Sequence, residues 1–300
     1  MSSSLVEFSN DLAGVVERAG QSIVGVLEGG REGVSGTVWR SGIAVTAEHT
    51  LRGRSSVTVV LPSGEQTTAE VIGRDPGTDI AALKIQEAVA AGTLGDDAQL
   101  RVGEIVLSVA RRGTAGVATT HGIVSATSGA WRTWQGARVD RWFRLDLNPF
   151  TGFSGGPIVN ARAEIVGMAT SGPRRSVVMI PTSTVNRVVE QLLKGGRVKR
   201  GFLGVGVQAV GFPENTVQEL KLGTNRGLLV LNVAQGSSAE RAGVLLGDIL
   251  VTIEGAAVHS VRSLQPVLDP ENVGKSVQLE VVRGGKLVKV AVVVGDREEN

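Results

Sequence analysis

A serine set among glycines, Gly152-Phe153-Ser154-Gly155-Gly156-Pro157, constrains this 300-residue chain more than any other feature. A serine hydroxyl becomes an effective nucleophile when a base takes its proton and fixed backbone donors receive the charge that develops on the substrate. Glycines around Ser154 let the backbone approach a substrate closely, because they carry no side chain. The stretch is therefore a candidate catalytic loop. The alternative is a plain Gly-Ser turn between two strands, in a chain with 41 glycines.

The same residues satisfy the Gly-x-Ser-x-Gly pattern of α/β-hydrolases, in which the serine lies on a turn from a strand into a helix. Here Pro157, Ile158 and Val159 follow the loop, and β-branched residues favour an extended segment over a helix start. The hydrolase order also needs its histidine after the serine, and the one later histidine is His259. The order histidine, aspartate, serine is the better match.

The chain has three histidines, His49, His121 and His259, and one of them must act as the base. His49 follows the apolar, β-branched segment 43–47, so that a strand would deliver its imidazole to a site. His121 is interpreted as a surface or strand-edge residue, and His259 as a solvated turn residue. His49 is the predicted general base, which later returns the proton as an acid.

An orienting carboxylate must hold that imidazole in one tautomer. Asp79 is predicted to do so, because it lies between a turn and the apolar segment 80–85, where a charged group is partly buried. Asp75 is the competing candidate. It begins an Asp-Pro-Gly turn, however, and turn formation explains it without any role in catalysis.

Five pieces of the chain occur in an order that resembles the HtrA (DegP/DegS-like) family of serine proteases, over about residues 10–295. The resemblance implies that His49, Asp79 and Ser154 form a catalytic triad, and that the N–H groups of Gly152 and Ser154 form the oxyanion hole. The matching pieces are 45–49, 75–81, 122–126, 152–157 and a C-terminal domain.

The chain departs from the family pattern in two places. The family usually has Asn-Pro-Gly-Asn directly before the serine, whereas this chain has Phe150-Thr151-Gly152-Phe153. The loop at 29–35, long in some relatives, is short here. The two phenylalanines predict a loop with two packings, only one of which aims the Gly152 N–H at the oxyanion.

The predicted fold class is mainly β. Short β-rich runs fill residues 23–180 in two sets of about six, which is typical of paired β-barrels. A chymotrypsin-like double β-barrel protease domain is expected at 21–194, a linker at 195–200, and a PDZ domain, β-sandwich-like with short helices, at 201–297. Apolar residues at steps of 3 and 4 predict an amphipathic helix within 1–20. Residues 181–195 predict a second helix, capped by Thr or Ser near its start.

The four residues Phe202, Leu203, Gly204 and Val205 resemble the loop of HtrA-type PDZ domains that offers backbone N–H groups to a C-terminal carboxylate, with the ligand added as a strand. The alternative is an ordinary strand with one glycine. We expect C-terminal peptides to bind at this loop and to regulate the protease. The expected coupling free energy between the two sites is about 1–3 kcal/mol.

The resemblance also places one wall of the primary substrate pocket on the strand that follows the serine loop. Its candidate substrate-binding residues are Ala169, Thr170 and Ser171, none of which is charged. Cleavage is therefore expected after small or medium aliphatic residues rather than after Lys or Arg. Asp146 is a carboxylate from elsewhere that would alter this preference if it reached the pocket.

Composition excludes several other functions. The chain has no cysteine, so it forms no disulfide, thiolate metal site or cysteine nucleophile. No cofactor or metal is expected. The 31 basic and 29 acidic residues leave a net charge of +2, which is too small to indicate nucleic acid binding. Tryptophans and arginines alternate at 131–144, a pattern also found where single strands bind, but a loop packed beside the active site is favoured.

The N-terminus lacks the basic lead and the unbroken apolar core of a secretory signal, and no apolar run reaches the length of about 18 residues that spans a membrane. The chain as written is therefore expected in the cytoplasm, or in the periplasm if it begins inside a longer protein. The resemblance implies a homotrimer, because the N-terminal segment helps to build a trimer in the family.

The predicted function is a serine endopeptidase that cuts unfolded or misfolded polypeptides in protein quality control. The alternative, from a different class, is a catalytically inactive peptide-binding scaffold or chaperone with a vestigial triad.

Overall fold

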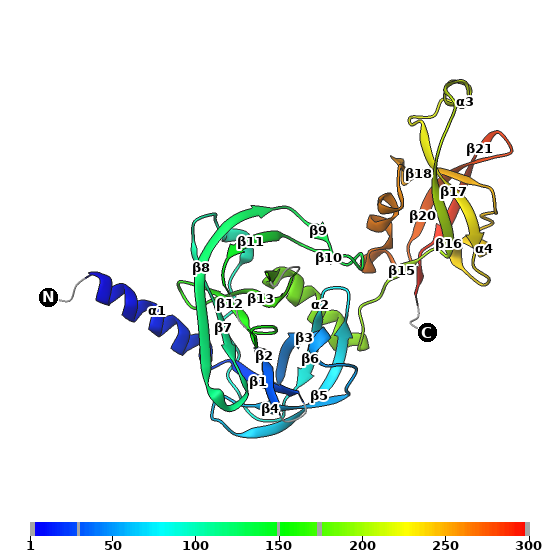
Figure 1. Ribbon diagram of the computed structural model, residues 1–300. Helices are drawn as coiled ribbons and strands as arrows, with labels where there is room; N and C mark the ends of the chain where they lie inside the picture. The colour runs from blue at the N-terminus through cyan, green and yellow to red at the C-terminus, as the bar shows by residue number, and fades with distance from the viewer. Residues whose placement is uncertain (1–3, 29–30, 149–150, 173–175, 298–300) are drawn as a thin grey trace. The chain divides into compact units, whose positions relative to one another are not determined.

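A computed structural model describes residues 4–28, 31–148, 151–172 and 176–297 of the chain (Figure 1). The chain divides into two compact units, Met1–Val198 and Lys199–Asn300, each of which is described by itself. Strands dominate both units, which confirms the predicted fold class. The finer division into 21–194, 195–200 and 201–297 stays a prediction.

The first half of unit 1 is a closed barrel of six antiparallel strands in the order β1-β2-β3-β6-β5-β4, shown in blue and cyan in Figure 1. Its interior holds aliphatic side chains such as Val38, Leu51, Val59 and Leu83. A single 3-10 turn, η1 (Glu48–Thr50), follows the third strand. The strands are β1 (Ile23–Glu28), β2 (Arg31–Arg40), β3 (Ile43–Ala47), β4 (Ser56–Val60), β5 (Gln66–Asp75) and β6 (Ile80–Lys84).

The second half is a six-stranded sheet in the order β11-β8-β7-β12-β13-β14, shown in green. The two strands at its edges also contact each other, so the sheet curls toward a barrel. A small hairpin, β9 (Trp131–Arg132) with β10 (Arg138–Val139), stands beside it. Its strands are β7 (Ile105–Arg111), β8 (Val117–Ser128), β11 (Trp142–Asp146), β12 (Pro157–Asn160), β13 (Ile165–Ser171) and β14 (Val177–Pro181), with η2 (Asp97–Gln99) and η3 (Gly113–Ala115) in the connections.

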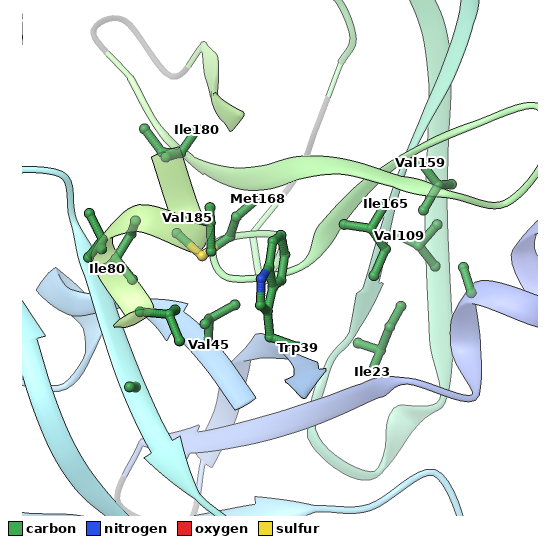
Figure 2. Packing of buried hydrophobic residues seen from close by; sticks show 14 of the residues in the cluster. Ile23, Trp39, Val45, Ile80, Val109, Val159, Ile165, Met168, Ile180 and Val185 are labelled. Carbon is green, nitrogen blue, oxygen red and sulfur yellow. The ribbon is translucent and has the colours of Figure 1, made fainter. Parts of the chain in front are cut away.

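The two halves share one core with helix α2 (Thr182–Gly195). The fully buried indole of Trp39 lies at its centre in Figure 2, among Val45 and Ile80 of the first barrel, Val109 and Ile165 of the second sheet, and Val185 of α2. The indole N–H also donates to Asn186 Oδ1 at 2.7 Å. Truncating a buried residue of this size costs about 3–5 kcal/mol, so the halves hold each other in place.

Helix α2 begins differently from the sequence prediction. Pro181 precedes its first turn, and no Thr or Ser side chain caps it. Asp97, from η2, accepts instead from the Ser183 N–H at 2.8 Å and from its hydroxyl at 3.2 Å. A carboxylate from far along the chain therefore caps the helix, which a local pattern does not reveal.

Helix α1 (Ser4–Gly20) packs on β7 and β8 through its C-terminal half, where Val15 and Ala19 are buried. Arg111 fixes that end by donating to the carbonyls of Gly20 and Ile23 at 3.3 and 2.9 Å, and burial lowers the pKa of this guanidinium. The N-terminal half extends beyond the sheet in Figure 1. It exposes three apolar side chains, Leu5, Val6 and Phe8.

Unit 2 is built on a sheet in the order β16-β17-β18-β20-β21, with β16 at one edge. Ser237 caps the short helix α4 by accepting from the Glu240 N–H at 3.2 Å, and Glu240 Oε2 accepts from the Gly236 N–H at 2.6 Å. The elements are β15 (Gly201–Phe202), β16 (Val205–Gly211), α3 (Glu214–Glu219), β17 (Arg226–Val233), α4 (Ser238–Arg241), β18 (Ile249–Ile253), β19 (Ala256–Ala257), η5 (Val261–Leu268), η6 (Pro270–Asn272), β20 (Ser276–Arg283), β21 (Lys286–Val293) and β22 (Gly295–Asp296).

Candidate active site

The pairing of β3 with β6 brings His49 next to Asp79. Ala47 at the end of β3 lies opposite Ile80 at the start of β6, so the residues just beyond these ends are neighbours. Asp79 Oδ1 accepts from the His49 backbone N–H at 2.8 Å, and Oδ2 accepts from the ring Nδ1–H at 2.8 Å. Because an ionised carboxylate only accepts, the proton of a neutral imidazole lies on Nδ1 and Nε2 is left to act as a base.

A tight turn presents Asp79 in the left-handed conformation, with φ of +59°. Asp75 is buried and closes the turn, because its carboxylate accepts from the N–H groups of Gly77 and Thr78 at 3.2 Å and from the Thr78 hydroxyl at 2.6 Å. The two carboxylates predicted to compete thus have separate environments. Asp75 shapes the turn, and Asp79 contacts the imidazole.

Thr170 has a role that the sequence did not indicate. Its hydroxyl donates to Asp79 Oδ2, the oxygen that also accepts from His49. The side chain predicted as a wall of the substrate pocket therefore orients the carboxylate. Ala169 is buried, and its N–H and carbonyl bond to Gly156 and Gly155 at 2.8 Å, so it anchors the serine loop. Ser171 is exposed, and its Oγ lies 3.5 Å from His49 Nε2.

The loop that carries Ser154 is held by buried residues of the first barrel. Ser35 Oγ–H donates to the Gly152 carbonyl at 2.7 Å, and the Ser35 N–H donates to the Ser154 carbonyl at 3.0 Å. Thr37 Oγ1 donates to the Gly155 carbonyl at 2.9 Å. Among the residues that the structure describes, neither the Gly152 N–H nor the Ser154 N–H donates a hydrogen bond, so both are available to an oxyanion.

Glycine is required at two positions of this loop. Gly152 and Gly155 have φ of +102° and +85°, values that favour glycine. A Cβ at Gly152 would lie 2.7 Å from Arg112 Cγ, and one at Gly155 would lie 2.0 Å from the Ser35 carbonyl oxygen. Phe153 is buried, so the side chain of one of the two phenylalanines is shielded from water. Phe150, the other, lies outside the described residues.

A cavity of about 920 Å³ opens beside the His49 and Asp79 pair. Thr170 and Ser171 contribute to its lining, together with the tryptophans Trp131, Trp134 and Trp142. Between the two described residues Ser154 and His49, no Oγ–Nε2 hydrogen bond is present. Such bonds are often long without substrate and tighten when it binds. The tryptophan segment lies beside His49, as the sequence analysis favoured, whereas the contacts of Ser35 with the serine loop and of Thr170 with Asp79 were not predicted.

The predicted peptide loop of unit 2 has a similar backbone arrangement. Gly204 has φ of +84°, and a Cβ there would lie 2.1 Å from Ser237 Cβ. The carbonyls of Leu203 and Gly204 accept from Ala239 and Ala234 at 2.9 and 2.8 Å. Within the described part of unit 2, the N–H groups of Leu203 and Gly204 donate no hydrogen bond. They are therefore free to bind a carboxylate, beside Val205 at the start of the edge strand β16.

Neither a metal cluster nor a membrane-spanning helix is found in the described ranges. No group of three or more His, Asp or Glu side chains among these residues is placed to hold a metal ion. None of the helices there is both long enough and apolar enough to cross a bilayer.

Comparison with known proteins gives two domain matches. Residues 34–168 match the trypsin-like peptidase domain, and residues 201–294 match the PDZ domain. The first match contains His49, Asp79 and Ser154, and the second contains Phe202–Val205.

Whole-chain relatives and solved structures agree with these matches. The serine protease Do-like HtrA of Lactobacillus helveticus is 33% identical over 94% of this chain and 73% of its own length. A probable periplasmic serine endoprotease, DegP-like, of Chlamydia trachomatis is 32% identical over 88% of this chain, which spans only 54% of that relative. The HtrA-type protease AlgW, solved with a decapeptide, superposes with a TM-score of 0.76 at 26% identity, over 96% of this chain and 99% of AlgW.

Proposed function

Because the chain belongs to the HtrA family of serine proteases, we propose that it is a serine endopeptidase that cleaves unfolded or misfolded polypeptides. The observation that carries the proposal is the Asp79 carboxylate, which holds both the backbone and the ring of His49 at 2.8 Å. The chain spans about half the length of the DegP-like relatives it matches, so its activity is proposed from its own residues.

The proposed mechanism assigns one step to each group. His49 Nε2 takes the proton of Ser154 Oγ as that oxygen attacks the scissile carbonyl, and then gives the proton to the leaving amine. Asp79, oriented by Thr170, stabilises the imidazolium in between. The N–H groups of Gly152 and Ser154 receive the negative charge on the substrate oxygen.

The test is hydrolysis of unfolded casein together with labelling by a fluorophosphonate serine probe. We expect Ser154→Ala to abolish labelling and to lower kcat by about 10⁴ or more. Ser171→Ala is the matched control, because Ser171 is the hydroxyl found 3.5 Å from His49 Nε2, and it should still be labelled. A wild type that binds peptides but is never labelled would support the inactive scaffold instead.

For the primary pocket we propose cleavage after small or medium aliphatic residues. Ala169, Thr170 and Ser171 lie on β13, the second strand after the serine loop, and their lack of charge supports this preference. Asp146, the carboxylate that would alter this preference if it reached the pocket, lies at the end of β11. Cleavage sites mapped on casein should follow residues such as Val, Ala or Leu, and a majority after Lys or Arg would contradict the proposal.

We further propose that unit 2 binds C-terminal peptides at Phe202–Val205. The free N–H groups of Leu203 and Gly204 support carboxylate binding, and the edge strand β16 supports addition of the ligand as a strand. The AlgW structures contain a decapeptide in one case and a tripeptide in another. A peptide with a free C-terminus should bind more tightly than its amide in isothermal titration.

We also propose a quaternary structure and a location. Leu5, Val6 and Phe8 form an exposed apolar patch on α1, which supports contact between copies in a homotrimer. Sedimentation of the wild type should give three times the chain mass, and Phe8→Asp should lower it. The DegP-like relatives are named as periplasmic, so we propose a location outside the cytoplasm rather than the cytoplasmic one expected from the chain as written.

A further inference from the structure

We propose that the tryptophan-lined cavity beside His49 is a subsite for a bulky apolar side chain of the substrate, upstream of the residue in the primary pocket. This inference rests on the proposed endopeptidase function. The cavity is continuous with the catalytic pair, because the same lining includes His49, Asp79, Ser171 and Gly172. The primary pocket is proposed at Ala169 to Ser171, and we take the substrate to run antiparallel to residues 169–172, which places its upstream residues beside Ser171, Gly172 and the tryptophans.

The hairpin that carries the exposed tryptophan is fixed at its tip. The Thr133 N–H donates to the Ala137 carbonyl at 3.0 Å, and the Gly136 N–H donates to the Thr133 carbonyl at 2.9 Å. The Thr133 hydroxyl donates to the Gly77 carbonyl at 2.8 Å. Gly77 belongs to the turn that presents Asp79, so the hairpin and the catalytic carboxylate share one support.

The base of the hairpin is fastened to α2. Asp140 lies 3.2 Å from Arg138 Nε and 3.2 Å from Arg187 Nε. The Thr184 hydroxyl donates to Asp140 Oδ2 at 3.0 Å and accepts from the Asp140 N–H at 2.8 Å. These bonds keep the hairpin, and with it Trp134, at the cavity.

Trp134 is nevertheless 98% exposed. A buried indole removes about 150–250 Å² of surface from water, and tryptophan is enriched among the residues that dominate binding. Trp134 makes no comparable contribution to the folded core. An apolar substrate side chain that enters the cavity would cover it, with the half-buried Trp131 and Trp142 forming other walls.

The charges around the cavity favour an apolar occupant. Glu48 pairs with Arg74 at 3.3 Å, and Asp79 pairs with His49. Among the lining residues that the structure describes, Arg144 is the remaining charged one, and it is exposed. The other walls include Leu145, Val177 and Val178. The described lining therefore offers a charged partner only at the exposed Arg144, and the rest of it favours an apolar side chain.

A single nucleic acid strand is a poorer fit, although tryptophans and arginines alternate here. Arg132 donates to the Gly136 carbonyl at 2.9 Å, Arg141 donates to the Ala98 carbonyl at 3.2 Å, and Arg138 pairs with Asp140. These guanidinium groups form hydrogen bonds and an ion pair within the protein, so they are less available to bind phosphates.

The experiment uses the full-length Ser154→Ala protein and tryptophan-free peptides that differ only by Phe or Gly at one upstream position, scanned along the peptide. Peptide binding is followed by tryptophan fluorescence. At one position the Phe peptide should bind about 10-fold more tightly than the Gly peptide, which corresponds to about 1.4 kcal/mol, and should shift the emission to shorter wavelength. Trp134→Ala should reduce this preference to about 2-fold, and Trp134→Phe should retain most of it.

Val102→Ala is the matched control, because Val102 is also an exposed apolar residue but does not line the cavity, and it should leave the preference unchanged. Equal affinity for Phe and Gly peptides at every position, a preference that survives Trp134→Ala, or displacement of the peptide by a single-stranded oligonucleotide would overturn the proposal. The peptide binding test needs no cleavage. Labelling of wild-type Ser154 without any Phe preference rejects the subsite alone, whereas absent labelling rejects the protease function.

Discussion

The hydroxyl of Ser35 donates a 2.7 Å hydrogen bond to the carbonyl oxygen of Gly152. The direction of this bond is fixed, because Ser35 Oγ also accepts from the Arg111 N–H at 3.0 Å, which leaves its own proton for Gly152. The Ser35 N–H meanwhile donates to the Ser154 carbonyl at 3.0 Å. One buried residue of the first barrel thus holds both residues whose N–H groups form the proposed oxyanion hole.

Ser35→Ala should lower kcat by about 10- to 100-fold with little change in KM. Loss of an oxyanion donor itself costs about 10²–10³, and loss of its support should cost less. Inhibition by a peptide boronate, which mimics the tetrahedral intermediate, should weaken by the same factor as kcat/KM.

Ser108→Ala is the matched control for Ser35→Ala. Ser108 is equally buried, and its Oγ has no hydrogen-bond partner among the described residues. Its kinetics should be unchanged. A loss of thermal stability in Ser35→Ala with kcat intact would show that Ser35 has a structural role only.

Asp79→Asn and Asp75→Asn should separate catalysis from turn formation. Asp79→Asn should lower kcat by about 10⁴, because an amide cannot hold the imidazole in the required tautomer. Asp75→Asn should lower the free energy of unfolding by about 1–3 kcal/mol, because the amide NH2 that replaces one carboxylate oxygen cannot accept from the buried donors of Gly77 or Thr78. Calorimetry and casein hydrolysis on both variants check this. The assignment fails if Asp75→Asn causes the larger loss of kcat in protein that remains folded.

Peptides with free apolar C-termini should raise kcat/KM several-fold, consistent with a coupling of about 1–3 kcal/mol, and their amides should do so much less. Gly204→Val should remove the effect and leave basal cleavage intact, because a Cβ at Gly204 would lie 2.1 Å from Ser237 Cβ. The rate at which a reporter peptide is cleaved measures both the activation by the C-terminal peptide and the basal cleavage. Equal rates with and without a peptide that is shown to bind would mean that unit 2 tethers substrates and does not regulate.

The stability of unit 2 should fall in acid through Asp248. Burial would raise the pKa of this carboxyl, but hydrogen bonds from Arg283 and Leu245 and the charge of Arg283 hold it below its ordinary value of 3.8. A depressed pKa in the folded state means that the stabilisation is complete above about pH 4 and is lost as the pH falls through the folded value.

Asp248→Asn measures that contribution. Arg283 donates to both carboxylate oxygens at 2.8 and 2.7 Å but is about a third exposed, so solvent screening keeps the expected cost at neutral pH to no more than about 3 kcal/mol. Hydrogen exchange of amides in β17, β18 and β20 should show this loss, and a flatter acid dependence than the wild type. An acid profile identical to that of the wild type would exclude Asp248 as the group responsible.

The sequence predicts those features that depend on neighbouring residues. The apolar, β-branched run of β3 and the Asp-Pro-Gly turn before Asp79 can each be recognised from a few neighbouring residues. The bonds that orient the site do not. Ser35 is separated from Gly152 by 117 positions, and Thr170 from Asp79 by 91. A hydroxyl at either position fits a strand equally well without any partner, so its role emerges only when the two halves of unit 1 meet.

Helix α2 follows Ser154 in the chain, yet Val185, Val188, Val189 and Leu192 complete the core around Trp39. Synthesis at the ribosome therefore delivers the nucleophile before the residues that seal the two halves together. A nascent chain that has passed Ser154 but not yet released Leu192 lacks the apolar cover of that core. The core that joins the two halves of unit 1 can therefore close only after the last turn of α2 has emerged.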